Sequence, residues 1–318
     1  MTTRILKLAA VAASLLLLAG CAAGATGTQT STPGGRVQVV ASTNVYGSIA
    51  EAVGGDAVEV TSMIASVSQD PHEFEASASD QLLVRRAGLL IENGGGYDPF
   101  MESLITASGT KAPVITAAEL SPEYPADGNL DSHKDDADHA HDHLEGFNEH
   151  VFYDPAVMAK LAQEIADRLA KLEPAHAASF EANAKSFAAG TGKIEATLAG
   201  IAAAHGGAGV FVTEPLPLYL TDASGLDNKT PAAFSEAVEE GQDVPPATLL
   251  AALRTIASGD VAVVITNAQA AGAETTQVEE KAKGAKVPVL RFSEILPDGK
   301  TYLEWMQGNA DALKKALG

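Results

Sequence analysis

The chain has 318 residues and carries 41 acidic against 21 basic side chains, a formal net charge of −20. A surface of this sign repels nucleic-acid phosphates and anionic lipids and favours cations, so we expect no nucleic-acid partner. Its length allows two lobes with separate cores within the roughly 280 residues that follow Gly35.

The first residues are typical of a lipoprotein signal peptide. Arg4 and Lys7 precede an apolar run, residues 8–19, that is too short to span a bilayer comfortably. The run ends in Leu-Ala-Gly before Cys21, the only cysteine of the sequence, which predicts a signal peptide over residues 1–21 and lipidation of Cys21. The mature protein would then be anchored to the outer face of the cytoplasmic membrane. The alternative is a buried core cysteine behind a hydrophobic helix.

Residues 22–35 are predicted to form a flexible tether. They are small and turn-forming, without charge or apolar periodicity, and cannot bury enough surface to offset the entropy of ordering. Removal of the signal peptide takes away Arg4 and Lys7, which leaves 19 basic against 41 acidic residues. With Cys21 lipidated, no disulfide is available, and core packing must stabilise the mature domain.

Strands and helices alternate in two separate runs. The spacing of apolar residues predicts parallel, doubly wound sheets with helices on both faces. In the first run we predict strands at 37–43, 57–64, 88–93 and 113–119, with helices at 44–55, 77–88 and 98–109. In the second run we predict strands at 209–214, 261–267 and 287–292, with helices at 217–225, 245–259, 274–284 and 301–317.

A helical segment, 156–205, separates the two runs. Asp154 and Pro155 are typical of an N-cap and first helical turn. A second helix, 174–204, has an apolar stripe long enough to contact both lobes. The predicted fold is therefore α/β: two lobes, 36–155 and 206–318, each with a mainly parallel sheet flanked by helices, joined by a long rigid linking helix.

One histidine follows the end of the second predicted strand. Open α/β sheets place ligand sites at the carboxyl ends of their strands, and His72 lies there. Asp70, Glu73 and Glu75 surround it with negative charge, which a bound cation would satisfy. The alternative is a solvated or capping histidine.

Two further residues lie at corresponding positions. His150 directly precedes the helical segment, and Glu214 ends the first strand of the second lobe. Taken singly, they could be a histidine packed under a loop and a turn residue. Two histidines with one carboxylate are nevertheless a recognised ligand set for zinc or manganese.

Several motifs, taken in order, resemble the zinc and manganese solute-binding lipoproteins of bacterial ABC importers. The resemblance covers nearly all of 36–318 and rests on STNVYGSIAEAVGGDAVEVTSMI, DPHEFE, IENGGGYDPF, HVFYDP, VTEPLPLYL and VPVLRFSEILPDGKTYLEWM. It implies a metal held between two lobes by His72, His150 and Glu214, and delivery of that metal to a membrane permease. It also implies a monomeric binding protein and not an enzyme.

The fourth ligand position departs from the family pattern. The family places a carboxylate in the loop after the penultimate strand, whereas this chain has ITNAQAAGA and no carboxylate before Glu274. Asn267 is the predicted ligand there, with Gln269, a water or a second oxygen of Glu214 as alternatives. Asn267 could instead orient a ligand carboxylate.

The segment 131–149 is predicted to be a metal-collecting loop. It holds four closely spaced histidines among acidic residues and has no apolar pattern: His133, His139, His141 and His143. Imidazole favours zinc over manganese, so Zn²⁺ is the predicted metal and Mn²⁺ the alternative. A solvated loop without a metal role is the competing interpretation.

Two other function classes remain open. A zinc hydrolase could use the same ligands, but no HExxH motif is present and Glu73 is the only nearby candidate base. An adhesin or interaction lipoprotein with a structural metal is the second alternative; such a protein would unfold when the metal is removed.

Overall fold

The computed structural model describes residues 35–125, 146–270 and 272–318. The predicted signal peptide, Cys21, residues 22–34 of the tether and the four loop histidines lie outside the described residues. Within the described ranges, no helix has the length and apolar character needed to cross a membrane.

The N-terminal half forms one parallel sheet. Its strands are β1 (Val37–Thr43), β2 (Val58–Ile64), β3 (Leu89–Glu92) and β4 (Val114–Thr116). Its helices are α1 (Asn44–Gly54), α2 (Ala78–Arg86) and α3 (Pro99–Ser108). The strand order is β2-β1-β3-β4, and every pair is parallel, so all four carboxyl ends meet at one edge.

Two helices follow this sheet, α4 (Pro155–Leu172) and α5 (Ala177–His205). Asp154 caps α4 as predicted, because its Oδ1 accepts hydrogen bonds from the backbone N–H groups of Ala156 and Val157. The chain enters α5 through a short 3₁₀ turn, Pro174–His176, so the α-helix begins three residues after the predicted start.

The C-terminal half repeats the architecture. Its strands are β5 (Gly209–Val212), β6 (Asp227–Asn228), β7 (Val261–Asn267) and β8 (Val289–Phe292), in the parallel order β6-β5-β7-β8. Its helices are α6 (Leu218–Ala223), α7 (Ala232–Glu239), α8 (Pro246–Ala257), α9 (Ala273–Ala285) and α10 (Tyr302–Leu317). Two of these elements, β6 and α7, were not expected from the sequence.

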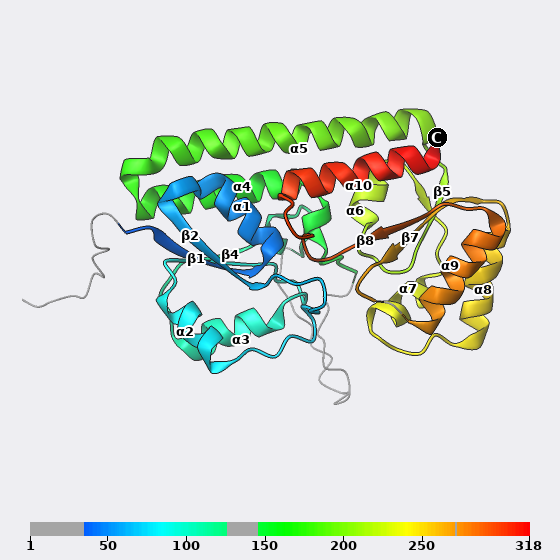
Figure 1. Cartoon of the computed structure of the whole chain (residues 1–318), viewed down its shortest axis with the longest axis horizontal. Helices are drawn as coiled ribbons and strands as arrows, with labels where there is room; N and C mark the ends of the chain where they lie inside the picture. Colours follow the sequence, from blue (N-terminus) through cyan, green and yellow to red (C-terminus); the bar gives the residue numbers. More distant parts are fainter. Residues whose placement is uncertain (1–34, 126–145, 271) are drawn as a thin grey trace, which may run out of the picture. The chain divides into compact units, whose positions relative to one another are not determined.

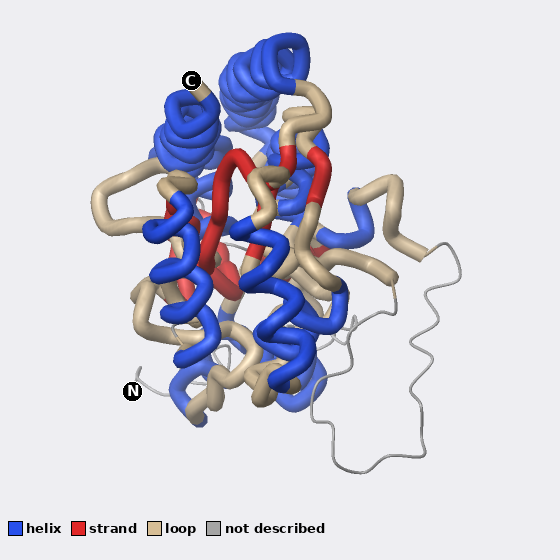
Figure 2. Tube along the Cα trace, turned by 90° about the vertical axis from the view of Figure 1, so that its right-hand side faces the viewer, coloured by secondary structure: helices blue, strands red, loops and turns tan. Residues whose placement is uncertain are grey.

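Helices cover both faces of each sheet, as Figure 2 shows. In β1, Val39 packs in the core cluster that also contains residues of α1 and α4, whereas the neighbouring Val40 packs with residues of α2 and α3. In the second half, Val212 of β5 joins the first of these clusters and Phe211 packs with residues of α7, α8 and α9. This alternation, with both faces apolar, is expected of parallel strands buried on both sides and confirms the predicted α/β class.

The helix α5 connects the two halves. It packs against α1 and α4 toward its N-terminal end and against α6 and α10 toward its C-terminal end, and it runs alongside both sheets in Figure 1. Gly190 allows the close approach of α10, because a Cβ there would lie 2.5 Å from the Leu303 side chain. The apolar stripe of α5 and residues of both sheets belong to one continuous core, so the halves cannot move freely about a flexible hinge.

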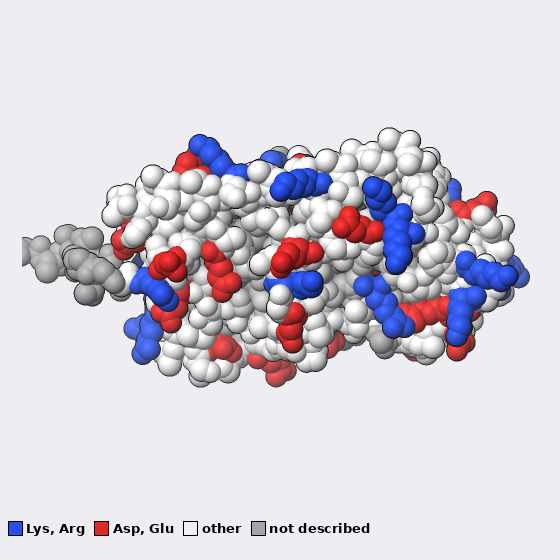
Figure 3. All heavy atoms as spheres, turned by 45° about the horizontal axis from the view of Figure 1, so that its top comes forward, with Lys and Arg blue, Asp and Glu red and all other residues white. Residues whose placement is uncertain are grey.

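Acidic and basic side chains are interspersed on the face that carries α5 and α10 (Figure 3). The large acidic excess of the chain is therefore not gathered as a single-sign patch on this face.

Candidate metal centre

The candidate site is built at the carboxyl ends of strands from both halves. His72 lies in the loop after β2, and His150 lies directly before the turn that leads into α4. Glu214 follows β5, and Glu294 follows β8. Three of these four side chains follow parallel strands, where such sheets present their ligand sites, and His150 comes from the segment before α4.

The structure brings the two predicted histidines together. The ring centroids of His72 and His150 lie 6.4 Å apart. The ring of Tyr97, from the loop after β3, packs edge-to-face against both imidazoles, with centroid distances of 5.1 Å to His72 and 5.8 Å to His150. An aromatic side chain therefore limits the orientations that both rings can adopt.

Asn148 determines which nitrogen of His150 can bind a metal. The amide nitrogen of Asn148 donates to the backbone oxygen of Pro215, 3.1 Å away, so its Oδ1 is the acceptor. That oxygen lies 2.9 Å from His150 Nδ1, which therefore carries the proton. The lone pair is then on Nε2, which lies 3.4 Å from Oε1 of Glu239 at the end of α7.

Two overlapping groups of side chains could hold a metal ion. In the first, one ligand atom from each of His72, Glu149, His150 and Glu239 lies within 4.8 Å of the others. In the second, Asp70, His72 and Glu294 meet the same limit. His72 belongs to both groups. Imidazole nitrogens combined with carboxylate oxygens suit zinc and manganese.

The predicted ligand Glu214 is in neither of these groups of the described residues, but Asn267 connects it to Glu294 of the second group. The Nδ2 atom of Asn267 donates to Oε2 of Glu214 and to Oε1 of Glu294, at 2.6 Å in each case. Its Oδ1 accepts from the backbone N–H of Gln269, 2.9 Å away. Both ends of the Asn267 amide are thus engaged. These contacts agree with the interpretation that Asn267 orients carboxylates, while its role as a direct ligand stays a prediction.

Gln269, an alternative for the fourth position, connects loops of the two halves. Its Oε1 accepts from the backbone N–H groups of Glu294 and Ile295, at 2.7 and 3.2 Å. Its Nε2 donates to the backbone oxygen of Gln69, 3.1 Å away, in the loop that carries His72. Gln269 therefore holds the loop after β8 next to the loop after β2.

Two buried carboxyl groups have strongly raised pKa values. Burial raises the pKa of Glu214 to about 8 and that of Glu294 to about 7, in both cases against the lowering effect of the Asn267 amide. The negative charge of Asp70 raises both further. Glu214 Oε1 and Glu294 Oε2 are buried and have no hydrogen-bond partner among the described residues. A bound cation would offset the cost of burying these charges.

Glu239 has the same kind of environment. Burial raises its pKa well above the usual value, and the charges of Glu149, Glu214 and Glu294 raise it further. Its Oε2 also lacks a hydrogen-bond partner within the described ranges. The site therefore combines two imidazoles with an excess of buried carboxylates.

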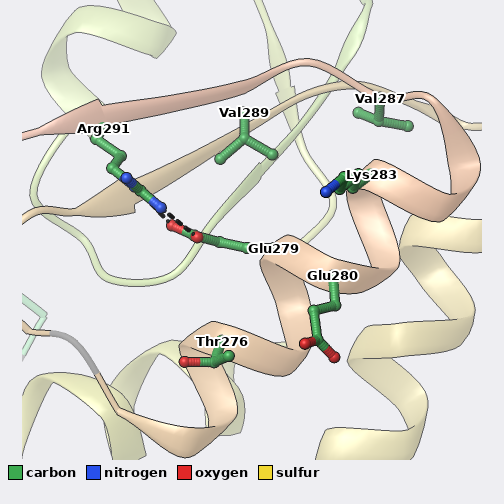
Figure 4. Close-up of a pocket in the computed structure, with 7 residues that line it drawn as sticks. All are labelled: Thr276, Glu279, Glu280, Lys283, Val287, Val289 and Arg291. Atoms are coloured by element: carbon green, nitrogen blue, oxygen red, sulfur yellow. Dashed lines mark hydrogen bonds and ion pairs between the residues drawn. The ribbon is translucent and has the colours of Figure 1, made fainter.

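A separate hollow of about 550 Å³ lies between α9 and β8 (Figure 4). Arg291 on its rim pairs with Glu279, with N–O distances of 2.9 and 2.5 Å. Its lining is completed by Thr276, Glu280, Lys283, Val287 and Val289. The lining contains no imidazole, and its two acidic side chains, Glu279 and Glu280, are matched by the basic Lys283 and Arg291.

Three carboxylates were missed in the sequence. Glu294 had a usable signal, because it follows a parallel strand just as Glu214 does. Glu149 precedes His150 directly, but sequence adjacency does not show which way a side chain points. Glu239 had no signal, since it ends a helix that was not predicted.

Residues 39–316 match the model of a protein family described as ZnuA, zinc-uptake complex component A periplasmic. The high-affinity zinc uptake system protein ZnuA of Bacillus subtilis (strain 168) is 25% identical over 313 residues, which cover 96% of each chain. The manganese-binding lipoprotein MntA of Halalkalibacterium halodurans is 28% identical over 172 residues, which cover 54% of this chain and 51% of that protein. The iron ABC transporter substrate-binding lipoprotein MtsA of Streptococcus pyogenes is 25% identical over 328 residues, which cover 96% of this chain and 95% of the relative.

Solved structures resemble the fold. A crystal structure of ZnuA superposes with a TM-score of 0.69 at 19% identity, and the periplasmic zinc binding protein TroA from Treponema pallidum with 0.70 at 17%. Each comparison covers 89% of this chain and 100% of the other. At these identities the likeness concerns the fold alone.

Proposed function

Because this chain belongs to the ZnuA family of metal-uptake components, we propose that it captures a divalent transition metal and delivers it to the membrane permease of an ABC importer. The metal is the cargo. Zn²⁺ is the proposed metal, because two imidazoles contribute to the site and more histidines lie in segment 131–149. Mn²⁺ is the alternative, because the remaining donors are oxygens.

The observation that supports this proposal most strongly is the meeting of His72 and His150 beside buried carboxylates. Burying several carboxylates together is unfavourable without a compensating cation. The donor atoms come from loops in both halves, so one ion would be held between the halves. This assignment makes the protein a metal-binding protein and not an enzyme. We further propose a monomer, anchored through lipidated Cys21 on the outer face of the membrane.

Substitution of the histidines tests the proposal. His72→Ala and His150→Ala should each weaken Zn²⁺ binding by at least about a hundredfold, because direct ligands matter more than the partners that orient them, whose loss costs about 10- to 100-fold. Calorimetric titration with a competing chelator measures this. His176→Ala is the matched control, because His176 is exposed at the start of α5. Wild-type zinc affinity in both site variants would refute the assignment.

A further inference from the structure

Helix α7 places a carboxylate against the predicted ligand His150. Glu239 is the last residue of this helix, and its Oε1 lies 3.4 Å from the Nε2 atom of His150. Oxygen atoms of Glu239 and Glu149 also lie within 4.8 Å of ligand nitrogens of His72 and His150. No other residue of α7 belongs to these groups of the described residues.

Helix stability does not explain the position of Glu239. The C-terminal end of a helix carries partial negative charge, so a carboxylate there is unfavourable. The following residue, Glu240, is exposed, as expected of a charge at such an end. The Glu239 side chain, in contrast, is only 11% exposed. A buried acid at the wrong end of a helix requires a compensating interaction.

Apart from the contact with His150, the surrounding charged side chains do not supply that interaction. The charged side chains that act most strongly on Glu239 are Glu149, Glu214 and Glu294, which are all acidic. Its Oε2 is buried without a hydrogen-bond partner in the described part of the chain.

Orientation of His150 does not require Glu239 either. Asn148 already fixes this ring through its contact with Nδ1, on the opposite side from Nε2. A cation bound by Glu239 and by Nε2 of His150 would balance the charge of Glu239.

We propose that Glu239 is a further metal ligand, which α7 contributes to the same ion that His72 and His150 bind. This inference rests on the proposed function. With Glu239 as a ligand, α7 is the element of the C-terminal half that contacts the metal next to His150. It also adds an anionic oxygen to the donor set, and carboxylate oxygens favour Mn²⁺ more than imidazoles do.

Glu239→Gln tests the inference, with Glu240→Gln as the matched control in the same helix turn. The Glu239→Gln variant should lose at least about tenfold in Zn²⁺ affinity and release zinc faster, because it lacks one anionic ligand. Its loss of Mn²⁺ affinity should be larger still. The control should bind both ions within about twofold of wild type. Titration of the full chain with each metal alone, against a chromophoric chelator, gives these values.

A spectroscopic readout separates ligation from a structural role. In protein loaded with Co²⁺, the visible d–d bands should shift in Glu239→Gln and remain unchanged in Glu240→Gln. The metal-free Glu239→Gln protein should melt at the wild-type temperature or above, because it no longer buries that acid. Unchanged Co²⁺ bands together with wild-type Zn²⁺ affinity would overturn the inference.

His72→Ala, titrated in the same experiment, tests the proposed metal site separately from the proposed role of Glu239. If His72→Ala loses zinc and Glu239→Gln does not, the proposed function stands and the role of Glu239 is refuted. If His72→Ala binds zinc normally, the proposed site itself is refuted.

Discussion

The two halves contribute different chemistry to the candidate site. Both imidazoles, His72 and His150, come from the N-terminal half, where Tyr97 packs against them. The C-terminal half contributes the buried carboxylates Glu214 and Glu294, which the amide of Asn267 joins. Under the proposed function, a metal ion would complete its ligand set only between the halves.

The halves also differ in how firmly their loops are held. The loop after β8 is fixed by Asn44, whose side chain exchanges two 2.9 Å hydrogen bonds with the backbone of Leu296. Tyr153 donates to the backbone oxygen of Ser293 in the same loop, 2.8 Å away. His72, in contrast, is only partly buried in its loop. The contacts of the loop after β8 therefore preorganise the backbone next to Glu294.

The largest effect should separate the two halves by metal. His72→Ala should weaken Zn²⁺ binding more than Mn²⁺ binding, whereas Glu294→Gln should do the reverse, because nitrogen donors favour zinc and carboxylates suit manganese. For Glu294→Gln we expect a loss of about 10- to 100-fold in Mn²⁺ affinity.

Parallel titrations of both variants with both ions measure this contrast. Glu240→Gln controls for the loss of one negative charge. Equal losses of affinity for Zn²⁺ and Mn²⁺ in both variants would contradict the claim that the two halves contribute donors with different metal preferences.

The second effect concerns pH and the carboxylate side alone. In the unfolded chain these carboxyls ionise near pH 4.5, but in the folded, metal-free protein Glu214 does so near 8 and Glu294 near 7. Between these values the folded state binds more protons than the unfolded state. The free energy of unfolding should therefore fall by several kcal/mol as pH rises from about 5 to 8, because the two shifts add to roughly 6 pKa units at about 1.4 kcal/mol each.

Zinc should reverse this trend, because it favours the ionised carboxylates and releases their protons on binding. Urea unfolding at several pH values, with and without Zn²⁺, checks both parts. If the free energy of unfolding of the metal-free protein rises steadily from pH 5 to 8, the raised pKa values of Glu214 and Glu294 are contradicted.

The smallest effect concerns Asn267. Asn267→Ala removes the donor that joins Glu214 to Glu294, and unfolding in urea should show a loss of about 1–3 kcal/mol. Asn228→Ala is a control on the exposed strand β6. If Asn267 orients carboxylates, Asn267→Ala should lower metal affinity less than Glu294→Gln does; a larger loss would support its role as a direct ligand.

Sequence patterns predicted the strands that carry the site, because β-branched runs alternate clearly with amphipathic helices. They missed α7, because its apolar face, formed by Phe234, Ala237 and Val238, extends over only eight residues, about two helical turns. They also missed β6, which has two residues and is too short to show a period. His72 and His150 could be predicted because motifs surround them. Glu239 could not, since its role depends on where the fold places the end of α7.

Glu214 after β5 and Glu294 after β8 occupy equivalent positions at strand ends, although only Glu214 was predicted as a ligand. Asn267, at the end of β7, was predicted as the fourth ligand, and its amide bonds both carboxylates. Only the folded chain shows that this amide lies between two acids, because three separate loops meet there.

Anomalous diffraction at the zinc edge, from crystals of the zinc-loaded protein, tests the central claim most directly. The account predicts one strong peak within about 2.0–2.2 Å of a ring nitrogen of His72, of Nε2 of His150 and of at least one carboxylate oxygen from the C-terminal half. A strong peak that lies away from either imidazole, or that is bound by residues of one half alone, would contradict it.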